Sequence, residues 1–437
     1  MKITVIGTGY QGLVVGTCFA ESGHIVTCVD WDKERISLLK QGEIPIYEPG
    51  LSELVSRNIE EERLFFTDSL QEAVQNCLLV FLCMDPVLSY STVDDIIKPV
   101  LDVVKIVARV MTGYRIIVNK MTLPPGTADK IKETLKENTP HPFDIVVNPD
   151  FLKQGTAVDD FLRPDRVVVG CEDVRVQEIM KEIYSPFLRT GRPLLLMSLR
   201  SAELSKYATA VMLAGRISII NQIADLCEVW GANISEVREA VGADSRIGQT
   251  FLFPGIGYGG IWLPRDLDLC MLFAKEKGIS YYLFDAIQKV NKERCEKFLS
   301  MILEHYKGDL NGKTLAIWGA SFKARTDDIR EAPSIFIIEE LLKKKAILRV
   351  FDPLAGPKLR ERFGTQIEIA PKQYPPLEGA EGLLVLTEWN EFRRPDYERM
   401  AQLMKEKVIF DGRNLYTPKT MASYGFRYYS IGRPPVG

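Results

Sequence analysis

Paired cysteines and clustered histidines are both absent from this sequence. Its eight cysteines are scattered along 437 residues, and no Cys-x-x-Cys pair occurs among them. We therefore expect free thiols in a reducing compartment rather than a disulfide framework. The three histidines, His24, His141 and His305, lie far apart and have no metal-ligand spacing. We interpret each of them as a surface or packing residue and expect no metal site.

A surplus of positive charge and a long hydrophobic run are also lacking. The chain carries 55 Lys and Arg against 58 Asp and Glu, a net charge of −3, which offers no basic surface to nucleic acid. No uninterrupted apolar run approaches the roughly 20 residues that span a bilayer. The first residues, MKITVIGTGY, begin as a strand and not as a signal peptide. We expect a cytoplasmic protein with neither a nucleic-acid nor a membrane partner.

The chain contains an alternation of strand and helix patterns at both ends. A length of 437 residues is enough for two or three domains. Short apolar runs separated by helical patterns predict a parallel sheet that is covered on both faces. In the first part of the chain these runs are ITVI, IVTCVD, LLVFLC, RIIVNK and FDIVVNPD.

A long helix is predicted in the middle. Residues 201–230 contain one glycine and no proline, and apolar residues recur at helical spacing nearly all round. The strand–helix alternation restarts at 313, with KTLAIW, ILRVFDP, EGLLVLTEW and KVIFDGRN as strands. The fold class is therefore α/β, with two Rossmann-like doubly wound domains joined by a long central helix. The expected domains are 1–198, 199–306 and 307–437. We interpret the charged segments EEERLFF and LKKKAI as solvated helix faces.

A glycine turn near the N-terminus points to a dinucleotide. Gly7, Gly9 and Gly12 follow a strand and open a helix, and Asp30 ends the next strand 18 residues after Gly12. In such a turn a diphosphate rests on the helix N-terminus, where free N–H groups and the helix dipole favour an anion. Asp30 would bind the adenosine ribose and repel a 2′-phosphate. We therefore predict NAD as the cofactor.

The motifs taken together resemble the UDP-glucose/GDP-mannose dehydrogenase family, most closely its UDP-glucose 6-dehydrogenases. The resemblance covers essentially the whole chain. It rests on an ordered series of segments: VIGTGYQGLV, GEIPIYEPGL, FLKQGTAVDDFLRPDRVVVG, ELSKYA, SRIG, FPGIGYGG, FKARTDDIREAPS, VFDP and VLTEWNEF followed by DGRN.

The resemblance implies an NAD domain, a central helical region that forms a homodimer, and a C-terminal domain that binds a UDP-sugar. The family oxidises a primary alcohol at sugar C6 to a carboxylate with two NAD. Between the two hydride transfers a cysteine thiolate traps the aldehyde, because a tetrahedral adduct is a better hydride donor than the free aldehyde. The second transfer makes a thioester, which water hydrolyses.

The resemblance also implies roles for individual residues. Lys206 would stabilise the developing oxyanion, Asp266 would orient a water or act as a base, and Thr122 would hold a catalytic water beside the cofactor. The implied catalytic set is Lys206, Asp266, Thr122 and Asp150. The implied cofactor contacts are Gly7, Gly9, Tyr10, Gly12, Asp30 and Thr122. The implied substrate contacts are Phe151, Leu152, Lys206, Arg246, Phe251, Leu252, Tyr258, Gly259, Trp262, Phe322, Lys323, Arg330 and Arg413.

Several departures from the family cluster around the sugar. Where the family has its nucleophilic cysteine, this chain has Trp262, whose indole offers one N–H donor and no nucleophile. An asparagine of the family is Ala210, and two glutamates are Asp150 and Gln154. The segment CMDPVLSYS, which follows the third of the predicted strands, is also altered.

Three functions fit this pattern. One is an NAD-dependent oxidoreductase that acts on a UDP-sugar without the cysteine thioester step. The second is a conventional UDP-glucose 6-dehydrogenase that gives UDP-glucuronate through a hydrated aldehyde. The third is a non-catalytic protein that binds NAD and a UDP-sugar.

Overall fold

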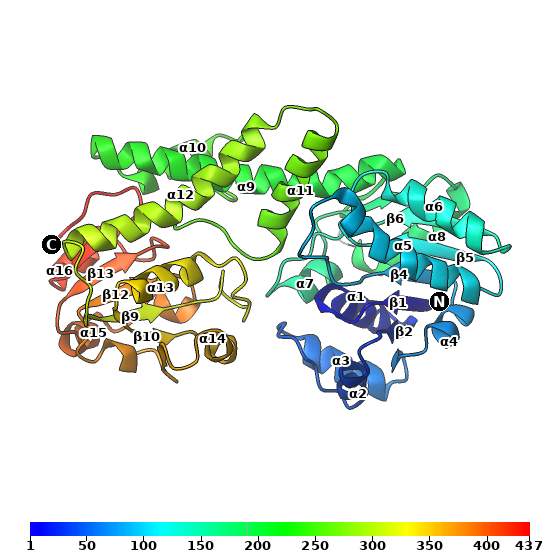
Figure 1. Ribbon diagram of the computed structural model, residues 1–437, viewed down its shortest axis with the longest axis horizontal. Coiled ribbons are helices and arrows are strands. Elements are labelled where there is room, and N and C mark those ends of the chain that lie inside the picture. Colours follow the sequence, from blue (N-terminus) through cyan, green and yellow to red (C-terminus); the bar gives the residue numbers. More distant parts are fainter. Residues whose placement is uncertain (190) are drawn as a thin grey trace. The chain divides into compact units, whose positions relative to one another are not determined.

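The computed structural model describes residues 1–189 and 191–437, which divide into two compact units, Met1–Thr209 and Ala210–Gly437. Each unit contains one sheet (Figure 1). The predicted α/β fold class is confirmed. Apolar runs form the strands, and the helical patterns between them form the connections, as in doubly wound folds.

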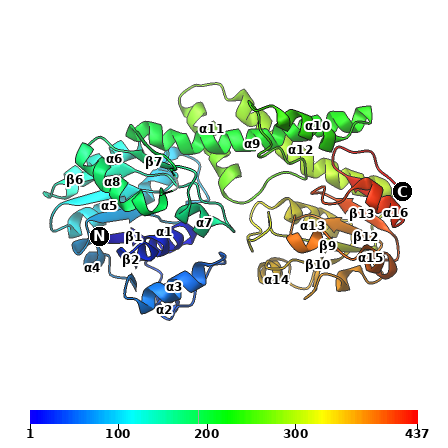
Figure 2. The same ribbon diagram turned by 180° about the vertical axis from the view of Figure 1, so that it is seen from behind.

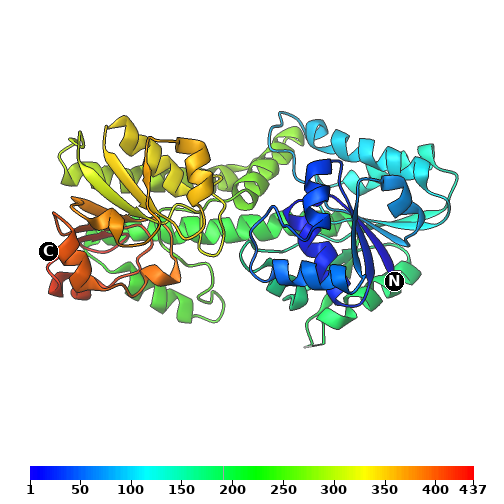
Figure 3. The same cartoon turned by 90° about the horizontal axis from the view of Figure 1, so that it is seen from below.

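The first unit is built on an eight-stranded sheet in the order β3-β2-β1-β4-β5-β6-β7-β8. All neighbouring pairs are parallel except β6 and β7. The order reverses at β1, so right-handed crossovers place the connecting helices on opposite faces, and Figure 3 shows helices on both sides of this sheet. The strands are β1 Lys2–Ile6, β2 Ile25–Val29, β3 Leu64–Thr67, β4 Leu79–Leu82, β5 Arg115–Asn119, β6 Phe143–Val147, β7 Val167–Gly170 and β8 Leu194–Met197.

The helices of this unit connect the strands, and the first of them is the most deeply buried. Residues Gln11–Ala20 of α1 are all buried in the core. The helices are α1 Tyr10–Glu21, α2 Lys33–Lys40, α3 Leu51–Glu60, α4 Leu70–Gln75, α5 Val93–Val110, α6 Thr127–Asn138, α7 Ala157–Leu162 and α8 Val174–Tyr184, followed by the short η1 Ser185–Phe187.

The long central helix is α9, Leu199–Trp230, close to the predicted 201–230. By length and composition it could also cross a membrane, and half of its most apolar window is buried inside the protein. Core helices of globular proteins can have the same length and composition.

The second unit contains a six-stranded sheet in the order β11-β10-β9-β12-β13-β14, with every pair parallel (Figure 2). Its strands are β9 Thr314–Trp318, β10 Ile347–Phe351, β11 Glu368–Ile369, β12 Gly382–Val385, β13 Val408–Asp411 and β14 Arg427–Ser430. Its helices, besides most of α9, are α10 Ile234–Ala243, α11 Trp262–Glu276, α12 Tyr282–His305, α13 Pro333–Lys343, α14 Gly356–Phe363, α15 Tyr397–Leu403 and α16 Pro418–Ser423, with η2 Pro375–Leu377 and η3 Asn390–Phe392.

Two interpretations of charged segments were wrong. EEERLFF is not one helix face, because α3 ends at Glu60 and β3 begins at Leu64. LKKKAI likewise contains the end of α13 at Lys343 and the start of β10 at Ile347. In both segments the charged residues form the turn that connects a helix to a strand, and the apolar residues that follow are drawn into the sheet.

Candidate functional site

The glycine turn at the N-terminus has the geometry that its spacing predicted. It connects β1 to α1, and Gly7 has a φ of +101°, which favours glycine. A Cβ on Gly7 would lie 2.5 Å from the carbonyl oxygen of Cys83, and one on Gly12 would lie 2.0 Å from the carbonyl oxygen of Gly7. These two glycines are therefore required by the packing of the protein itself. The turn leaves the N-terminus of α1 available to an anion.

Gly9 meets a charged neighbour instead. A Cβ on Gly9 would lie 1.8 Å from Oδ1 of Asp85, in the altered segment after β4. The Asp85 side chain is 58% exposed and forms an ion pair with Arg35, Nη1 to Oδ2, at 3.5 Å. Because Gly9 is the glycine that lets a diphosphate approach the backbone, the carboxylate occupies the same space. The turn fits a dinucleotide once Asp85 rotates away, which its exposure permits.

Asp30 lies at the end of β2, beside the turn. Its carboxylate accepts hydrogen bonds from the Thr8 backbone N–H at 2.7 Å and from the Thr8 hydroxyl at 2.8 Å. Burial favours a higher pKa, but the donors from Thr8 and Asp32 and the charge of Arg35 outweigh it and hold the pKa of Asp30 below its usual value. Asp30 is thus a carboxylate at neutral pH, which suits a ribose and opposes a 2′-phosphate.

Sequence reasoning did not select Arg35, which lies 3.6 Å from Asp30 and also pairs with Asp85. A cation five residues after Asp30 is a signal that the sequence contains. Sequence reasoning did select Tyr10 as a cofactor contact, and its hydroxyl donates to Glu48. Glu48 also accepts from the backbone N–H groups of Gly155 and Ala157 at 2.6 and 2.7 Å, so Tyr10 helps to hold the segment after β6.

Two of the predicted reactive residues form an ion pair in the first unit. Nζ of Lys206, on α9, lies 3.2 Å from Oδ1 of Asp150, which follows β6, and their side chains are only 11% and 8% exposed. Phe151 lies beside this pair, with Lys206 Nζ 5.5 Å from its ring centroid and the Arg166 guanidinium 3.7 Å from it. Thr122, which follows β5, is also buried. A buried ammonium beside a carboxylate can stabilise a developing oxyanion and receive or release a proton.

A cavity of about 210 Å³ adjoins this pair. Asp150, Phe151, Leu152 and Lys120 contribute to its lining, together with Arg166 and Tyr184. The predicted substrate contacts Phe151 and Leu152 thus share a cavity with the Asp150 carboxyl group. Ligand pockets are usually about 300–1,000 Å³, so this cavity suits a fragment of a ligand and not a whole nucleotide sugar.

A second group of predicted residues surrounds the glycine-rich segment 255–260 in the second unit. Its four glycines are explained by the protein around them. A Cβ on Gly259 would lie 2.1 Å from the Glu331 carbonyl oxygen, and one on Gly260 would lie 2.8 Å from the Phe322 ring. Gly257, with a φ of +103°, would meet Asn291 at 2.8 Å. The segment is therefore packed against protein on several sides.

Much of the backbone of this segment is already hydrogen-bonded within the protein. Free N–H and C=O groups in such a glycine-rich segment could approach a sugar. The structure instead pairs Tyr258 in both directions with the Asn291 amide, at 2.9 and 3.0 Å. Other groups of the segment are bonded as well. The Gly255 N–H donates to the Asn221 side chain, and the Ile256 N–H donates to the Gly412 carbonyl oxygen. The Cys295 thiol donates to the Ile256 carbonyl oxygen, and the Gly260 N–H donates to the Arg330 carbonyl oxygen.

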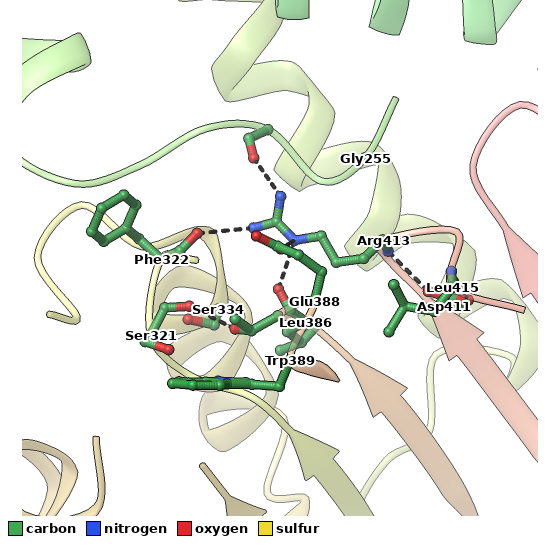
Figure 4. A network of polar contacts seen from close by, with 12 residues as sticks. Gly255, Ser321, Phe322, Ser334, Leu386, Glu388, Trp389, Asp411, Arg413 and Leu415 are labelled. Carbon is green, nitrogen blue, oxygen red and sulfur yellow. Dashed lines mark hydrogen bonds and ion pairs between the residues drawn. The ribbon is translucent and has the colours of Figure 1, made fainter. Parts of the chain in front are cut away.

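Arg413 holds three loops of the second unit together. Its guanidinium donates to the carbonyl oxygens of Leu386 at 2.8 Å, Gly257 at 3.0 Å and Phe322 at 3.3 Å. Figure 4 shows this side chain reaching across from the end of β13. Nε also lies 3.4 Å from Oε2 of Glu388. Arg413 therefore holds the loops of the predicted substrate site in position.

The remaining predicted substrate contacts all lie in the second unit. Lys323 Nζ lies 5.7 Å from the ring centroid of Phe322. Arg330 and Arg246 are exposed and pair with carboxylates two residues before them, Asp328 and Asp244, each at 2.6 Å. Phe251 has a φ of +60°, while Leu252 and Tyr258 are buried. Arg246 can exchange its pair for a phosphate, because surface ion pairs are weak, whereas the Asp328 partner of Arg330 is buried.

Trp262 is the first residue of α11, and Asp266 follows one turn later. Trp262 is half-buried, whereas Asp266 is completely buried, with Arg265 Nη1 3.8 Å from its carboxylate. A cysteine at a helix N-terminus gains thiolate character from the helix dipole. The tryptophan at this position provides none.

The eight cysteines all lie within the described residues, and none offers a thiolate elsewhere. Burial raises the pKa of every one of them. Cys270, one turn beyond Asp266, is raised to about 12, and Cys295, beside the 255–260 segment, to about 11. Such thiols are protonated and poorly nucleophilic at neutral pH. Among the same described residues no cluster of three or more His, Cys, Asp or Glu could hold a metal ion.

Comparison with known proteins places these features in a family. Residues 1–188 match the NAD binding domain of the UDP-glucose/GDP-mannose dehydrogenase family, 200–293 its central domain and 316–418 its UDP binding domain. The chain belongs to the UDP-glucose/GDP-mannose dehydrogenase family. It is thus an NAD-dependent nucleotide-sugar dehydrogenase by family, and NAD is its cofactor.

Individual relatives are similar over their whole length. UDP-glucose 6-dehydrogenase of Pseudomonas aeruginosa is 39% identical, over 100% of this chain and 98% of that protein. UDP-glucose 6-dehydrogenase TuaD of Bacillus subtilis is 38% identical, over 100% and 94%. The structure of a UDP-glucose dehydrogenase from Pyrobaculum islandicum has a TM-score of 0.89 at 31% identity and covers 99% of this chain and 98% of that one.

Proposed function

We propose that this protein is an oxidoreductase that transfers hydride between NAD and a UDP-sugar, without a cysteine thioester step. One observation carries the proposal. By the resemblance to the family, Trp262 at the start of α11 stands where the nucleophilic cysteine is expected, and burial raises the pKa of each cysteine that could replace it. An alcohol can still be oxidised, because hydride transfer needs only the cofactor, a base and orientation.

The residues for that oxidation are Lys206, Asp150, Thr122 and Asp266. NAD, when bound, supplies the hydride acceptor. The Lys206 ammonium stabilises the negative charge that develops on the sugar oxygen, and Asp150, 3.2 Å away, keeps that ammonium in place. Thr122 would hold a catalytic water beside the cofactor, and Asp266 would orient a water or act as a base. Gly7, Gly9, Gly12, Tyr10 and Asp30 surround the cofactor.

The UDP end of the substrate would contact the second unit. Lys323, Arg330 and Arg246 supply the cations for a diphosphate, which charge-assisted hydrogen bonds bind strongly. Arg413 positions the loops around them. Apolar surface for the base and the sugar would come from Phe322, Phe251, Leu252, Tyr258, Gly259 and Trp262. In the first unit, Phe151 and Leu152 remain predicted substrate contacts.

A second candidate is the conventional four-electron reaction, in which UDP-glucose becomes UDP-glucuronate. The names of the relatives at 39% and 38% identity favour it. Without a thiol the aldehyde would first take up water, and the hydrate would give up the second hydride.

The experiment counts NADH formed per UDP-glucose consumed, with sugar products identified by mass spectrometry. We expect one NADH and a product oxidised by two electrons. Two NADH with UDP-glucuronate would instead establish the conventional reaction. Binding of both ligands without any turnover would make the protein a non-catalytic binder.

We further propose a cytoplasmic homodimer organised as domains 1–198, 199–306 and 307–437, with no nucleic-acid or membrane partner. The exposed apolar residues of α9 support the dimer. Met212, Ile219 and Leu226 recur every seven residues and are 68%, 56% and 50% exposed. Seven-residue spacing places them along one side of the helix, as in helices that associate in pairs.

A further inference from the structure

Gln11 connects the dinucleotide turn to the predicted reactive pair. It is the second residue of α1, directly after the glycine turn, and it is buried with only 7% exposed. Its side-chain amide donates to the Lys120 carbonyl oxygen at 2.9 Å and to Oδ2 of Asp150, a residue 139 positions away. Both amide hydrogens are therefore engaged within the protein.

Asp150 is held from the other side as well. Its second oxygen, Oδ1, accepts from Lys206 Nζ at 3.2 Å and from the Leu152 backbone N–H at 3.4 Å. The donors on Oδ1 and Oδ2 together define the rotation of the carboxylate about its last bond. If the donor on Oδ2 is lost, that rotation is free on one side, and the oxygen that meets Lys206 moves with it.

We propose that Gln11 is a positioning residue that orients the Asp150 carboxylate toward Lys206. The inference rests on the proposed function, because it assigns the Lys206–Asp150 pair to the hydride-transfer step. An aspartate is one methylene shorter than a glutamate, so its carboxylate reaches less far from the backbone after β6. The long side chain of Gln11 meets it from α1.

The environment of Asp150 makes this orientation matter. Charged and titratable groups act on its carboxyl group from five other elements: Lys206 on α9, Lys120 after β5, Tyr10 on α1, Cys83 after β4 and Tyr184 on α8. Two of these groups are cations. Gln11, as a neutral donor, directs one oxygen without adding charge and leaves the other to Lys206.

Tyr10 provides a comparison within the same turn of helix. It reaches the same segment through Glu48, which caps the backbone of Gly155 and Ala157. Tyr10 therefore anchors the backbone of the segment, whereas Gln11 contacts the reactive side chain itself. A buried polar residue among the apolar residues Leu13, Val14 and Val15 is the sequence signal for this role.

The test replaces Gln11 with Met, which keeps the length and burial of the side chain and removes both donors. We expect kcat to fall by about 10- to 100-fold, since an ångström of misplacement costs about that much. KM for the UDP-sugar and Kd for NADH should change less than threefold.

A compensating pair separates positioning from general damage. Gln11→Asn and Asp150→Glu should each lower kcat, and the double variant should recover most of the loss, because one partner is shortened by the methylene that the other gains. Gln177→Met is the matched control. It removes a side-chain donor to the Cys171 carbonyl in the same unit, at 3.0 Å, and should leave kcat and KM unchanged.

A crystal structure of Gln11→Met gives a readout that does not need turnover. We expect the Lys206–Asp150 contact to lengthen beyond hydrogen-bond distance. If the wild-type protein transfers no hydride to any UDP-sugar, the proposed function fails, and this crystal structure still decides whether Gln11 orients Asp150. An unmoved Asp150 in that structure would overturn the proposal, as would a wild-type kcat or a parallel loss of NADH affinity.

Discussion

Trp262 is the residue on which the chemistry depends. It stands at the first position of α11, where a cysteine would be activated by the helix dipole. Its own indole can only pack and donate one hydrogen bond. The residues proposed to handle protons, Asp266 in the second unit and the Lys206–Asp150 pair in the first, are retained. Under the proposed function, this combination allows oxidation of an alcohol and removes the covalent intermediate that would carry it further.

Trp262→Cys is therefore expected to restore part of the second oxidation. The new thiol would occupy the helix N-terminus, so a fraction of it would be thiolate at neutral pH. The ratio of NADH to UDP-sugar consumed should rise from one toward two, with acid as a product. Trp262→Ser, which opens the same space without a thiol, should leave the ratio at one. A ratio of one in both variants would mean that Ala210 and Asp150 also prevent the step.

Asp85 is a second residue whose charge opposes the expected ligand. Its carboxylate lies against Gly9, in the space of the cofactor diphosphate. Asp85→Asn removes the repulsion and should tighten NADH binding by about tenfold, measured by fluorescence titration; each tenfold corresponds to about 1.4 kcal/mol. Asp94→Asn, an exposed acid on α5, is the control and should have no effect. Equal affinities in wild type and Asp85→Asn would show that the Asp85 carboxylate leaves the space of the cofactor diphosphate without a free-energy cost.

The segment 255–260 acts as one element that is locked into its surroundings. Its glycines accommodate the backbone of Glu331, the ring of Phe322 and the amide of Asn291, and its polar groups are bonded to the loops around it. A ligand is not needed to explain these glycines. The segment therefore forms a rigid support for whatever binds beside Trp262.

Gly259→Ala tests this rigidity. The new Cβ would lie 2.1 Å from a backbone oxygen, which cannot rotate away as a side chain can. Overpacking of this kind costs about 3 kcal/mol, so thermal or urea unfolding should show a clear loss of stability. Gly356→Ala, where the nearest atom is a side-chain methyl at 3.7 Å, should be close to neutral. Equal stability of the two variants would mean that the segment yields easily.

Arg413 connects this element to the strands of the second sheet. Arg413→Ala should weaken UDP binding at least tenfold by calorimetry, because the carbonyl oxygens of Leu386, Gly257 and Phe322 lose their common donor. Arg413→Lys should rescue little, since one ammonium cannot reproduce a planar guanidinium with several donors. Arg393→Ala, an exposed arginine of the same unit, is the control. An unchanged affinity in Arg413→Ala would exclude this segment from the UDP site.

At the scale of the molecule, α9 carries many large apolar side chains that are exposed, and this exposure needs an explanation. Its exposed residues Leu204, Met212, Ile219, Leu226, Val229 and Trp230 range from 50% to 80% exposure. Solvent contact with so many large side chains along one helix is unfavourable. A second copy of the chain is the partner that we propose.

Ile219→Asp combined with Leu226→Asp should convert the protein to a monomer in sedimentation equilibrium, because two carboxylates would be buried without partners in the interface. Val174→Asp introduces the same charge at an equally exposed apolar position on α8 and should leave the dimer intact. A dimer that survives the double substitution would place the interface elsewhere.

Local pattern was sufficient for the elements and the cofactor. The glycine spacing, Asp30 and the alternation of apolar runs predicted the first βαβ unit, the central helix and the second sheet, because each depends on residues close together in the chain. Short strands were missed, such as β3 behind its charged turn and β14 at the edge of its sheet. Their few apolar residues become strands only when a neighbouring strand supplies the hydrogen bonds.

Long-range contacts could not be predicted from the sequence in the same way. Gln11 meets Asp150, and Arg413 meets Gly257, across 139 and 156 residues, and no spacing in the chain indicates which polar groups will be buried against each other. The same is true of the glycines at 255–260, whose composition suits a ligand as well as a protein neighbour. Sequence motifs predicted the type of reaction. Only the tertiary structure determined which side chains can take part in it, because burial and hydrogen-bond partners are properties of the packed chain.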